Sequence, residues 1–495
     1  MKKNRNIIVI ILAVILLGGG VKIFLFRKNL HRSQNNRAES EEMLNIIKQT
    51  PPEQWMVILT KMNAEGDMHL HVMATYADAV DVLITVAERL SEDQWMDLLK
   101  MPNKKGETPM HVAATYKDGD QFLRVIAEKF PKRWVDLLEM RGSTGETPLH
   151  LATVNRRSGE AFFREVATRI LPAELVAFLK MSCHRGFTPL HTMTKLKNGD
   201  QLLKIVAEKL SPQQFVCVLD VKNHNTFTPL HLAATFESGA QFLSVLAEKL
   251  STQQLVNLLK KKDKNGFTSL YGAAVTENGD QFLKVLTEKL SSQQLVDLLK
   301  KKGKNGATPL YATAASKNGM AFLEVMVEKL SEEQLVSLLN IKNKNGDMPL
   351  HEATCSKNGV AFLGELAKKL SVQQLFDLLK TKNESGFTPL HFAAYADDGG
   401  AFLKVVIEKL SPQQLLDLLR TTNQWDFTPL HFAAGAEVPE KGVAFLKVVA
   451  EKLPSDQLEG LLKMKSKKGE TPLQMATMNK NQSFLETANS LLKNR

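Results

Sequence analysis

Apolar positions along residues 265–304 fall into three short runs separated by polar breaks. The first run contains Leu270, follows an Asn-Gly pair typical of a tight turn with positive φ, and is broken by Asn278 and Gly279. The third run follows Ser291–Gln294, which reads SSQQ and matches a capping box. The second run has four apolar residues at helical spacing: Phe282, Leu283, Leu286 and Leu290. The pattern predicts three consecutive short helices, with the second over 281–290.

The three-part pattern recurs along most of the chain. Each copy carries a motif like TPLH, as in Ser385–Ala394, which reads SGFTPLHFAA. Successive motifs lie 39 to 43 residues apart. The last motif position, called the slot here, holds these residues: His71, His111, His150, His191, His231, Tyr271, Tyr311, His351, His391, His431 and Gln474. A unit this short cannot bury its apolar face alone, so the repeat predicts an all-α solenoid of about eleven units over residues 42–495.

The motif itself resembles the ankyrin repeat. The sequence TPLHLAA after a turn and before a second helix, as at Thr228–Ala234, carries the resemblance. Ankyrin units are about 33 residues long, and an added SxQQLVxLL helix accounts for the longer period here. The resemblance implies that the slot side chain ties its turn to the neighbouring unit by hydrogen bonding. This sequence departs from the motif at these residues: His69, Ser269, Tyr271, Tyr311, Met348 and Gln474.

Three tryptophans mark the third helix of the first copies. Residues 42–61 resemble a half unit that contains Trp55, and Trp95 and Trp134 occupy the same place in the next two copies. The shared position predicts that all three are core residues.

The first residues follow a different pattern. Ile7–Phe26 is twenty residues long with fifteen Ile, Leu, Val or Phe, enough to cross a bilayer as a helix. We expect residues 1–31 to form a transmembrane anchor and 32–41 a linker, which predicts a single-pass membrane protein. The alternative is a cleaved signal peptide, with small residues at Gly18–Gly20, and a secreted protein. Basic residues flank both ends of the segment, so the side of the membrane that holds the repeats stays open.

The net charge limits the class of partner, and the cysteine content bears on disulfide bonds. The net charge is +11, of which the first fifty residues contribute +6 and residues 463–495 contribute +5, so the body is close to neutral. A nucleic-acid footprint needs basic charge on one face, and none is expected here, although Lys260–Lys264 forms a local strip. Cys183, Cys217 and Cys355 are widely spaced without a CxxC pair, so a disulfide framework is not expected.

The recurring histidine is interpreted as structural. Eight of the twelve histidines sit in the slot, whereas catalysis needs one tuned site with an orienting partner. His351–Cys355 reads HEATC and misses the HExxH zinc pattern by its last residue. We expect no catalysis, no cofactor, no metal and no small-molecule substrate.

A protein partner is expected on the turns and the first helices, where the resemblance places contacts. Aromatic residues recur there, and exposed aromatic side chains are enriched at binding hot spots. The candidates before the motif are Trp425, Phe427, Phe387, Phe267, Phe227 and Phe187, and those expected to end a first helix are Tyr76, Tyr116, Phe236 and Tyr395. Each Phe can equally pack on the next turn, whereas Trp425 breaks the pattern of the other copies.

The sequence therefore supports two hypotheses about function. The first is a membrane-tethered protein–protein interaction scaffold without catalysis, held in the bilayer by Ile7–Phe26. The alternative is a secreted ankyrin-repeat effector of an intracellular bacterium that binds a host protein; the Lys- and Asn-rich composition is similar to such proteins.

Overall fold

The structure is a computed structural model and describes residues 45–46, 49–64, 66–75, 80–154 and 159–493. The chain forms two compact units, Met1–Ile170 and Leu171–Arg495. Throughout the described ranges the regular secondary structure is helical.

The expected anchor and linker, residues 1–41, lie outside the described residues, and so does Tyr76. Among the described helices, none combines the length and the apolar character that crossing a bilayer requires.

The copies contribute three helices in a fixed order, as the apolar pattern predicts, and the last copy contributes the first two of them within the described residues. The copy around Tyr271 contains α18 (Ser269–Ala273), α19 (Gly279–Lys289) and α20 (Ser292–Leu299). The predicted capping box precedes α20. The Gln294 amide donates to Ser291 Oγ at 3.3 Å, and the Ser291 amide donates to Gln294 Oε1 at 3.0 Å.

The first helix of each copy is short and carries the slot residue. In the unit Met1–Ile170 the first helices are α4 (His69–Met73), α7 (Pro109–Ala113) and α9 (Pro148–Ala152). In the unit Leu171–Arg495 they are α12 (Pro189–Met193), α15 (Pro229–Ala233), α18, α21 (Pro309–Ala315), α24 (Pro349–Ala353), α27 (Pro389–Ala393), α30 (Pro429–Ala434) and α33 (Pro472–Met478). Proline suits the first helical position because its missing N–H would have no partner there.

The second helices are longer. In the unit Met1–Ile170 they are α5 (Val80–Ala87), α8 (Gly119–Lys129) and α10 (Gly159–Arg169). In the unit Leu171–Arg495 they are α13 (Gly199–Lys209), α16 (Gly239–Lys249), α19, α22 (Met320–Lys329), α25 (Gly359–Lys369), α28 (Gly399–Lys409), α31 (Pro439–Lys452) and α34 (Gln482–Lys493).

The third helices follow the second helices along the chain. In the unit Met1–Ile170 they are α3 (Trp55–Leu59) after the short 3₁₀ helix η1 (Pro52–Gln54), α6 (Glu92–Lys100) and the 3₁₀ helix η3 (Trp134–Leu138). In the unit Leu171–Arg495 they are α11 (Pro172–Lys180), α14 (Pro212–Leu219), α17 (Thr252–Leu259), α20, α23 (Glu332–Leu339), α26 (Val372–Lys380), α29 (Pro412–Arg420) and α32 (Ser455–Leu462).

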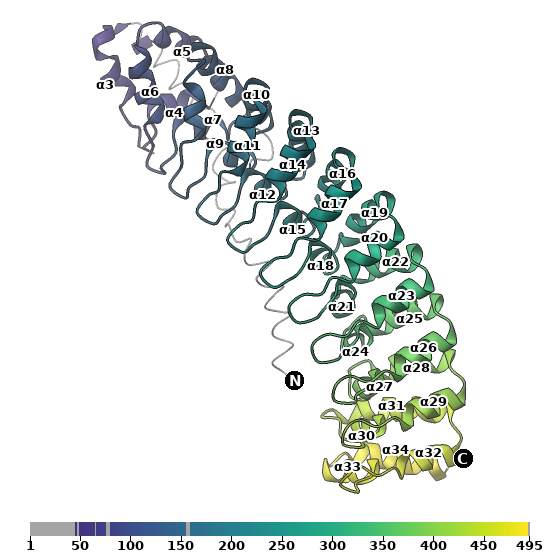
Figure 1. Cartoon of the computed structure of the whole chain (residues 1–495). Coiled ribbons are helices and arrows are strands. Elements are labelled where there is room, and N and C mark those ends of the chain that lie inside the picture. Colours follow the sequence, from purple (N-terminus) through teal and green to yellow (C-terminus); the bar gives the residue numbers. More distant parts are fainter. Residues whose placement is uncertain (1–44, 47–48, 65, 76–79, 155–158, 494–495) are drawn as a thin grey trace. The chain divides into compact units, whose positions relative to one another are not determined.

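Like helices stack on like helices within the unit Leu171–Arg495. First helices contact first helices in sequence order, as α27 contacts α30, and second helices contact second helices, as α28 contacts α31. Figure 1 shows this order, with the long turns projecting on the side of the first helices. Side chains of the turns and first helices of neighbouring copies therefore lie next to each other.

Within each unit the core consists of aromatic and aliphatic side chains that recur with the copies. The following phenylalanines from the second helices are all at most 2% exposed: Phe122 and Phe162 in the unit Met1–Ile170, and Phe242, Phe282, Phe322, Phe362, Phe402, Phe445 and Phe484 in the unit Leu171–Arg495. Trp55, Trp95 and Trp134 are 4%, 0% and 4% exposed, which confirms their prediction as core residues.

The glycine predicted to break the first helix instead begins the second. Helix α19 starts at Gly279, two residues before the expected start. A Cβ at Gly279 would lie 1.8 Å from the carbonyl oxygen of Ala273, so only glycine allows the two helices to approach this closely. The boundary is set by contact between helices, which the apolar pattern does not record.

The turn before each motif requires positive φ, as the Asn-Gly pair predicts. Gly266 has φ of +79°, and its amide donates to the Asp263 carbonyl oxygen at 3.0 Å. Two copies place other residues at this point: Thr226 has φ of +63° and Asp426 has φ of +58°. The left-handed conformation costs such residues about 1–2 kcal/mol.

Thr226→Gly should therefore raise the free energy of unfolding by about 1 kcal/mol. The change removes backbone strain and a buried Thr226 hydroxyl that has no partner among the described residues, against a glycine entropy cost of about 0.5–1 kcal/mol. Thermal melting of the full chain measures the shift. The reverse change at the equivalent position, Gly266→Thr, should lower the melting temperature, and a fall for Thr226→Gly would contradict the argument.

Candidate functional site

The slot histidine uses both of its ring nitrogens: Nδ1 bonds within its own copy and Nε2 bonds to the next copy. The Thr388 amide donates to His391 Nδ1 at 3.0 Å, and His391 Nε2 lies 3.0 Å from the Phe427 carbonyl oxygen in the next copy. An amide N–H only donates and a carbonyl oxygen only accepts, so the ring is the neutral tautomer with its proton on Nε2. The same bond to the next copy joins these pairs: His71 to Glu107, His111 to Glu146, His191 to Phe227, His231 to Phe267, His351 to Phe387 and His431 to Glu470.

These bonds confirm the predicted role of the slot residue as a tie between copies. Loss of solvation lowers the pKa of His391 to about 4, and the hydrogen bond to Phe427 offsets only part of this effect. The same cause lowers the pKa of His111, His231 and His351 to about 4. A buried neutral ring whose two nitrogens are both hydrogen-bonded has a structural role.

Tyrosine replaces histidine in two copies and makes different contacts. The Tyr311 hydroxyl donates to Glu352 Oε2 at 2.7 Å, and Asn343 Nδ2 donates to the same hydroxyl at 3.1 Å. Burial, together with the nearby Glu352, raises the pKa of Tyr311, so the hydroxyl stays protonated. Tyr271 stacks on Phe267 with ring centroids 3.8 Å apart. Glu352 is thus positioned by the slot residue of the preceding copy.

The turn phenylalanines lie in different environments. Phe267 is 7% exposed, stacks on Tyr271 and covers Gly303, where an added Cβ would lie 2.3 Å from the Phe267 ring. This geometry favours packing for Phe267. Phe187 is half-buried, and the Lys195 ammonium lies 5.0 Å from its ring centroid. Phe227 is half-buried beside the His231 ring.

Four of the expected aromatic residues gather with two others on the copies around His391 and His431. Phe387 is the centre of this group: its ring centroid lies 5.6 Å from Phe392, 5.3 Å from Phe432 and 6.0 Å from Trp425. Tyr395 lies 6.1 Å from both Phe392 and Phe432, and Phe427 lies 6.0 Å from Phe432. We call this group the aromatic platform: Phe387, Phe392, Tyr395, Trp425, Phe427 and Phe432.

Exposure differs across the aromatic platform. Trp425 is 46% exposed and contacts Phe387 edge to face, whereas the other five rings are half-buried. No other aromatic residue is among the exposed large hydrophobic side chains of the described residues. The platform therefore offers one protruding indole on a base of rings held by their neighbours.

Sequence reasoning missed Phe392 and Phe432. Both follow the slot directly, on the outward side of the first helix, where the other copies hold various small, aliphatic or polar residues. The signal in the sequence was the change from TPLHLAA to TPLHFAA in two consecutive copies. Only the stacking of α27 on α30 shows that these rings meet Phe387.

The aromatic platform carries a cost to the fold. In the neighbouring copy, Asn383 Nδ2 donates to Asp347 Oδ1 at 2.7 Å. The equivalent donor, Asn423, faces a copy with Phe387 in place of the aspartate, and its buried Nδ2 has no partner among the described residues. An unsatisfied buried donor costs about 1–3 kcal/mol. The same arrangement occurs outside the platform, where Asn223 faces the copy with Phe187 and its buried Nδ2 also has no partner among the described residues.

Two expected candidates lie elsewhere. Tyr116 and Phe236 are half-buried and were expected to end their first helices. They lie three residues beyond those ends, because α7 ends at Ala113 and α15 ends at Ala233. Both helices stop where the glycine of the next helix packs on their last carbonyl group, with Gly119 on Ala113 and Gly239 on Ala233. Tyr395 likewise lies two residues past the end of α27.

Basic side chains form a separate series on the ends of the third helices. In each of these lysines the Nζ donates to the backbone carbonyl oxygen of the equivalent lysine in the next copy, at 2.8–3.2 Å. The donors are Lys222, Lys262, Lys302 and Lys342. A cavity of about 470 Å³ beside the series has polar and charged lining residues: Lys380, Lys382, Asp417, Arg420, Thr421 and Thr422. This lining differs from the mostly apolar walls of small-molecule pockets.

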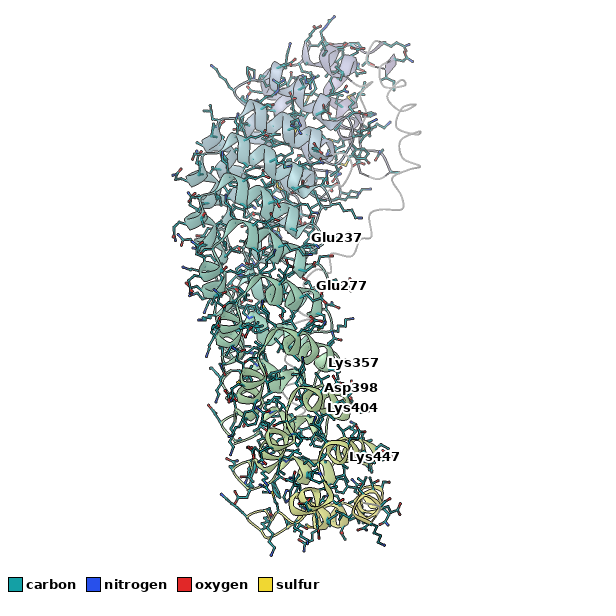
Figure 2. All side chains as sticks on the ribbon, turned by 90° about the vertical axis from the view of Figure 1, so that its right-hand side faces the viewer. Glu237, Glu277, Lys357, Asp398, Lys404 and Lys447 are labelled. Atoms are coloured by element: carbon teal, nitrogen blue, oxygen red, sulfur yellow. The ribbon has the colours of Figure 1, made fainter. Side chains whose placement is uncertain are left out.

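Charges of both signs lie along another edge. Figure 2 shows Glu237, Glu277, Lys357 and Asp398 following one another along this edge of the unit Leu171–Arg495. All four are exposed, so the edge is a solvated surface of mixed sign. Across the described ranges, His, Cys, Asp and Glu side chains form no group of three that could hold a metal ion.

Comparisons with known proteins give little. No family model and no curated protein matches the chain. Among solved structures, the chain is similar to the crystal structure of EF0377, described as an ankyrin repeat protein. The two are 15% identical, the match covers 42% of this chain and 96% of the other, and the TM-score is 0.30.

Proposed function

We propose that this chain is a protein-binding repeat protein of the ankyrin type, which holds its partner on the aromatic platform and performs no catalysis. The observation that carries the proposal is the exposed Trp425 on a base of five half-buried rings. Aromatic residues exposed in this way are the usual centres of binding hot spots.

Trp425→Ala should weaken partner capture at least tenfold while leaving the melting temperature within a few degrees of the parent. The indole is half in solvent, so its loss removes one edge-to-face contact worth about 1 kcal/mol. Capture of partner proteins by the immobilised full chain, quantified for each bound protein, measures the effect.

Val372→Ala is the matched control, since Val372 is 44% exposed on α26, away from the aromatic platform. Equal capture by the Trp425 and Val372 variants would place the binding surface elsewhere. A large drop in melting temperature for Trp425→Ala would assign the indole to packing.

A membrane tether at Ile7–Phe26 is the second part of the proposal, and its support is the apolar run in the sequence. The tether would restrict the partner to proteins that reach a bilayer. Fractionation of the full chain should recover it in membranes after alkaline extraction. Recovery in the soluble secreted pool without these residues would instead favour the secreted effector.

A further inference from the structure

The copy next to the aromatic platform carries two carboxylates in the same positions as the rings. Asp347 occupies the turn position of Phe387 and Phe427, four residues before the slot. Glu352 occupies the position of Phe392 and Phe432, one residue after the slot. The His351 ring lies 5.7 Å from Phe392, so this copy directly adjoins the platform.

Both carboxylates are held in place by neutral donors. Asp347 Oδ1 accepts from Asn383 Nδ2 at 2.7 Å, and Glu352 Oε2 accepts from the Tyr311 hydroxyl at 2.7 Å. Both residues are partly exposed. A neutral donor orients a carboxylate and brings no positive charge to it, so these two contacts leave an acidic group on each side chain at the border of the aromatic platform.

The corresponding positions across four copies contain no basic residue. Three positions of each copy are compared: four residues before the slot, one residue after it and four residues after it. For the slots from Tyr311 to His431 they hold these residues: Ala307, Ala312, Ala315, Asp347, Glu352, Cys355, Phe387, Phe392, Tyr395, Phe427, Phe432 and Gly435. This surface is therefore aromatic on one side and acidic on the other.

The chain itself shows how a cation sits on this surface. In an earlier copy, Lys195 is four residues after the slot, and its ammonium lies 5.0 Å from the ring of Phe187. The equivalent positions beside Phe387 and Phe427 hold Tyr395 and Gly435. Neither of these two positions therefore holds a lysine like the one that covers Phe187, and a cation over an aromatic face gains about 0.5–2 kcal/mol.

Building on the proposed function, we propose that this surface binds a protein segment that pairs an apolar side chain with a lysine or arginine. The apolar side chain contacts Trp425 and Phe387 on the aromatic platform. The cation lies between the rings and the carboxylates of Asp347 and Glu352. An acidic segment is the rival occupant, and it would bind the lysine series Lys222–Lys342 instead.

Two synthetic probes test this with the full chain: a ten-residue peptide of alternating Leu and Lys, and its counterpart with Glu in place of Lys. Fluorescence anisotropy gives each Kd at two salt concentrations. The lysine peptide should bind at least tenfold more tightly, and its affinity should fall with salt because the charges are partly exposed.

Glu352→Gln and Asp347→Asn should each raise the Kd of the lysine peptide several-fold, and together at least tenfold. Both changes keep an acceptor oxygen for Tyr311 or Asn383, so the fold is retained. Glu408→Gln is the matched control: it removes the same charge from an exposed position on α28 and should leave the Kd within twofold.

The outcomes separate this inference from the proposed function. Equal or tighter binding of the glutamate peptide, an unchanged Kd in the double variant, or no binding of the lysine peptide would overturn the basic-segment inference. The protein-binding proposal would still stand if Trp425→Ala lowered partner capture. Loss of lysine-peptide binding in Trp425→Ala as well as in the double variant would support both.

Discussion

Acidification from pH 7 to pH 5 is expected to remove roughly 8 kcal/mol of stability from the folded chain. Four slot histidines, His111, His231, His351 and His391, have a folded pKa of about 4, against 6.5 for the exposed ring. Between these values the unfolded chain binds protons that the folded chain excludes. Their stabilising effect is complete above pH 6.5 and is lost as the pH falls towards 4. Each ring accounts for roughly 2 kcal/mol of this loss of stability at pH 5.

Protonation also disrupts a hydrogen bond within each copy, while the Nε2 bond to the next copy keeps its donor. A proton on His391 Nδ1 would point at the Thr388 amide, which can only donate. Melting temperatures of the full chain from pH 7.5 to pH 4.5 measure the loss. A flat profile between pH 7 and pH 5 would show that the rings accept protons without disturbing the stack.

His391→Gln provides the control. The last copy already has Gln474 in the slot, where its Oε1 accepts from the Thr471 amide at 2.9 Å. Glutamine therefore replaces the acceptor without titrating. The variant should lose roughly 2 kcal/mol less than the parent between pH 7 and pH 5, and an identical loss would remove His391 from the group of titrating residues.

Gly359→Ala and Gly364→Ala are expected to change stability in opposite directions although both lie in α25. A Cβ at Gly359 would lie 1.9 Å from the Ala353 carbonyl oxygen and 2.8 Å from its carbonyl carbon. The backbone of α24 would have to move, at a cost of roughly 3 kcal/mol, the upper part of the range for overpacking. At Gly364 no atom lies within 4 Å of the added Cβ. Alanine should stabilise the helix there by about 0.8–1 kcal/mol.

Thermal melting measures both changes in one background. Amide hydrogen exchange of α24 and α25 shows whether the loss is confined to the neighbouring copies, as expected for a stack in which each copy contacts its neighbours. Stabilisation by both substitutions would mean that α24 and α25 can separate without cost. Destabilisation by Gly364→Ala would contradict the open space at that position.

Much of the architecture could be predicted because it depends on local rules. The period located eleven copies, the capping box at Ser291 marked the start of α20, and the glycine at 266 indicated positive φ. The shared position of the three tryptophans predicted their burial. Each of these features is decided by a residue together with neighbours a few positions away.

The candidate site could be predicted only in part. Phe387, Phe427, Trp425 and Tyr395 were proposed one by one, because each breaks or repeats a pattern within its own copy. The environment of each ring depends on the next copy: Phe267 lies over Gly303 and is buried, whereas Phe387 lies under Trp425 and forms a platform. Sequence separations of about 36 to 45 residues hide such pairs from a reading along the chain.

What the amino-acid sequence determined by itself is the repeating unit, its three helices and the residue in each slot, since these follow from spacing and capping. The tertiary structure alone decided the register of one copy against the next. That register brings the Phe427 carbonyl to His391 and Glu352 to Tyr311. The physical reason is that carbonyl groups, ring faces and carboxylates acquire partners only when helices distant in sequence come within contact distance.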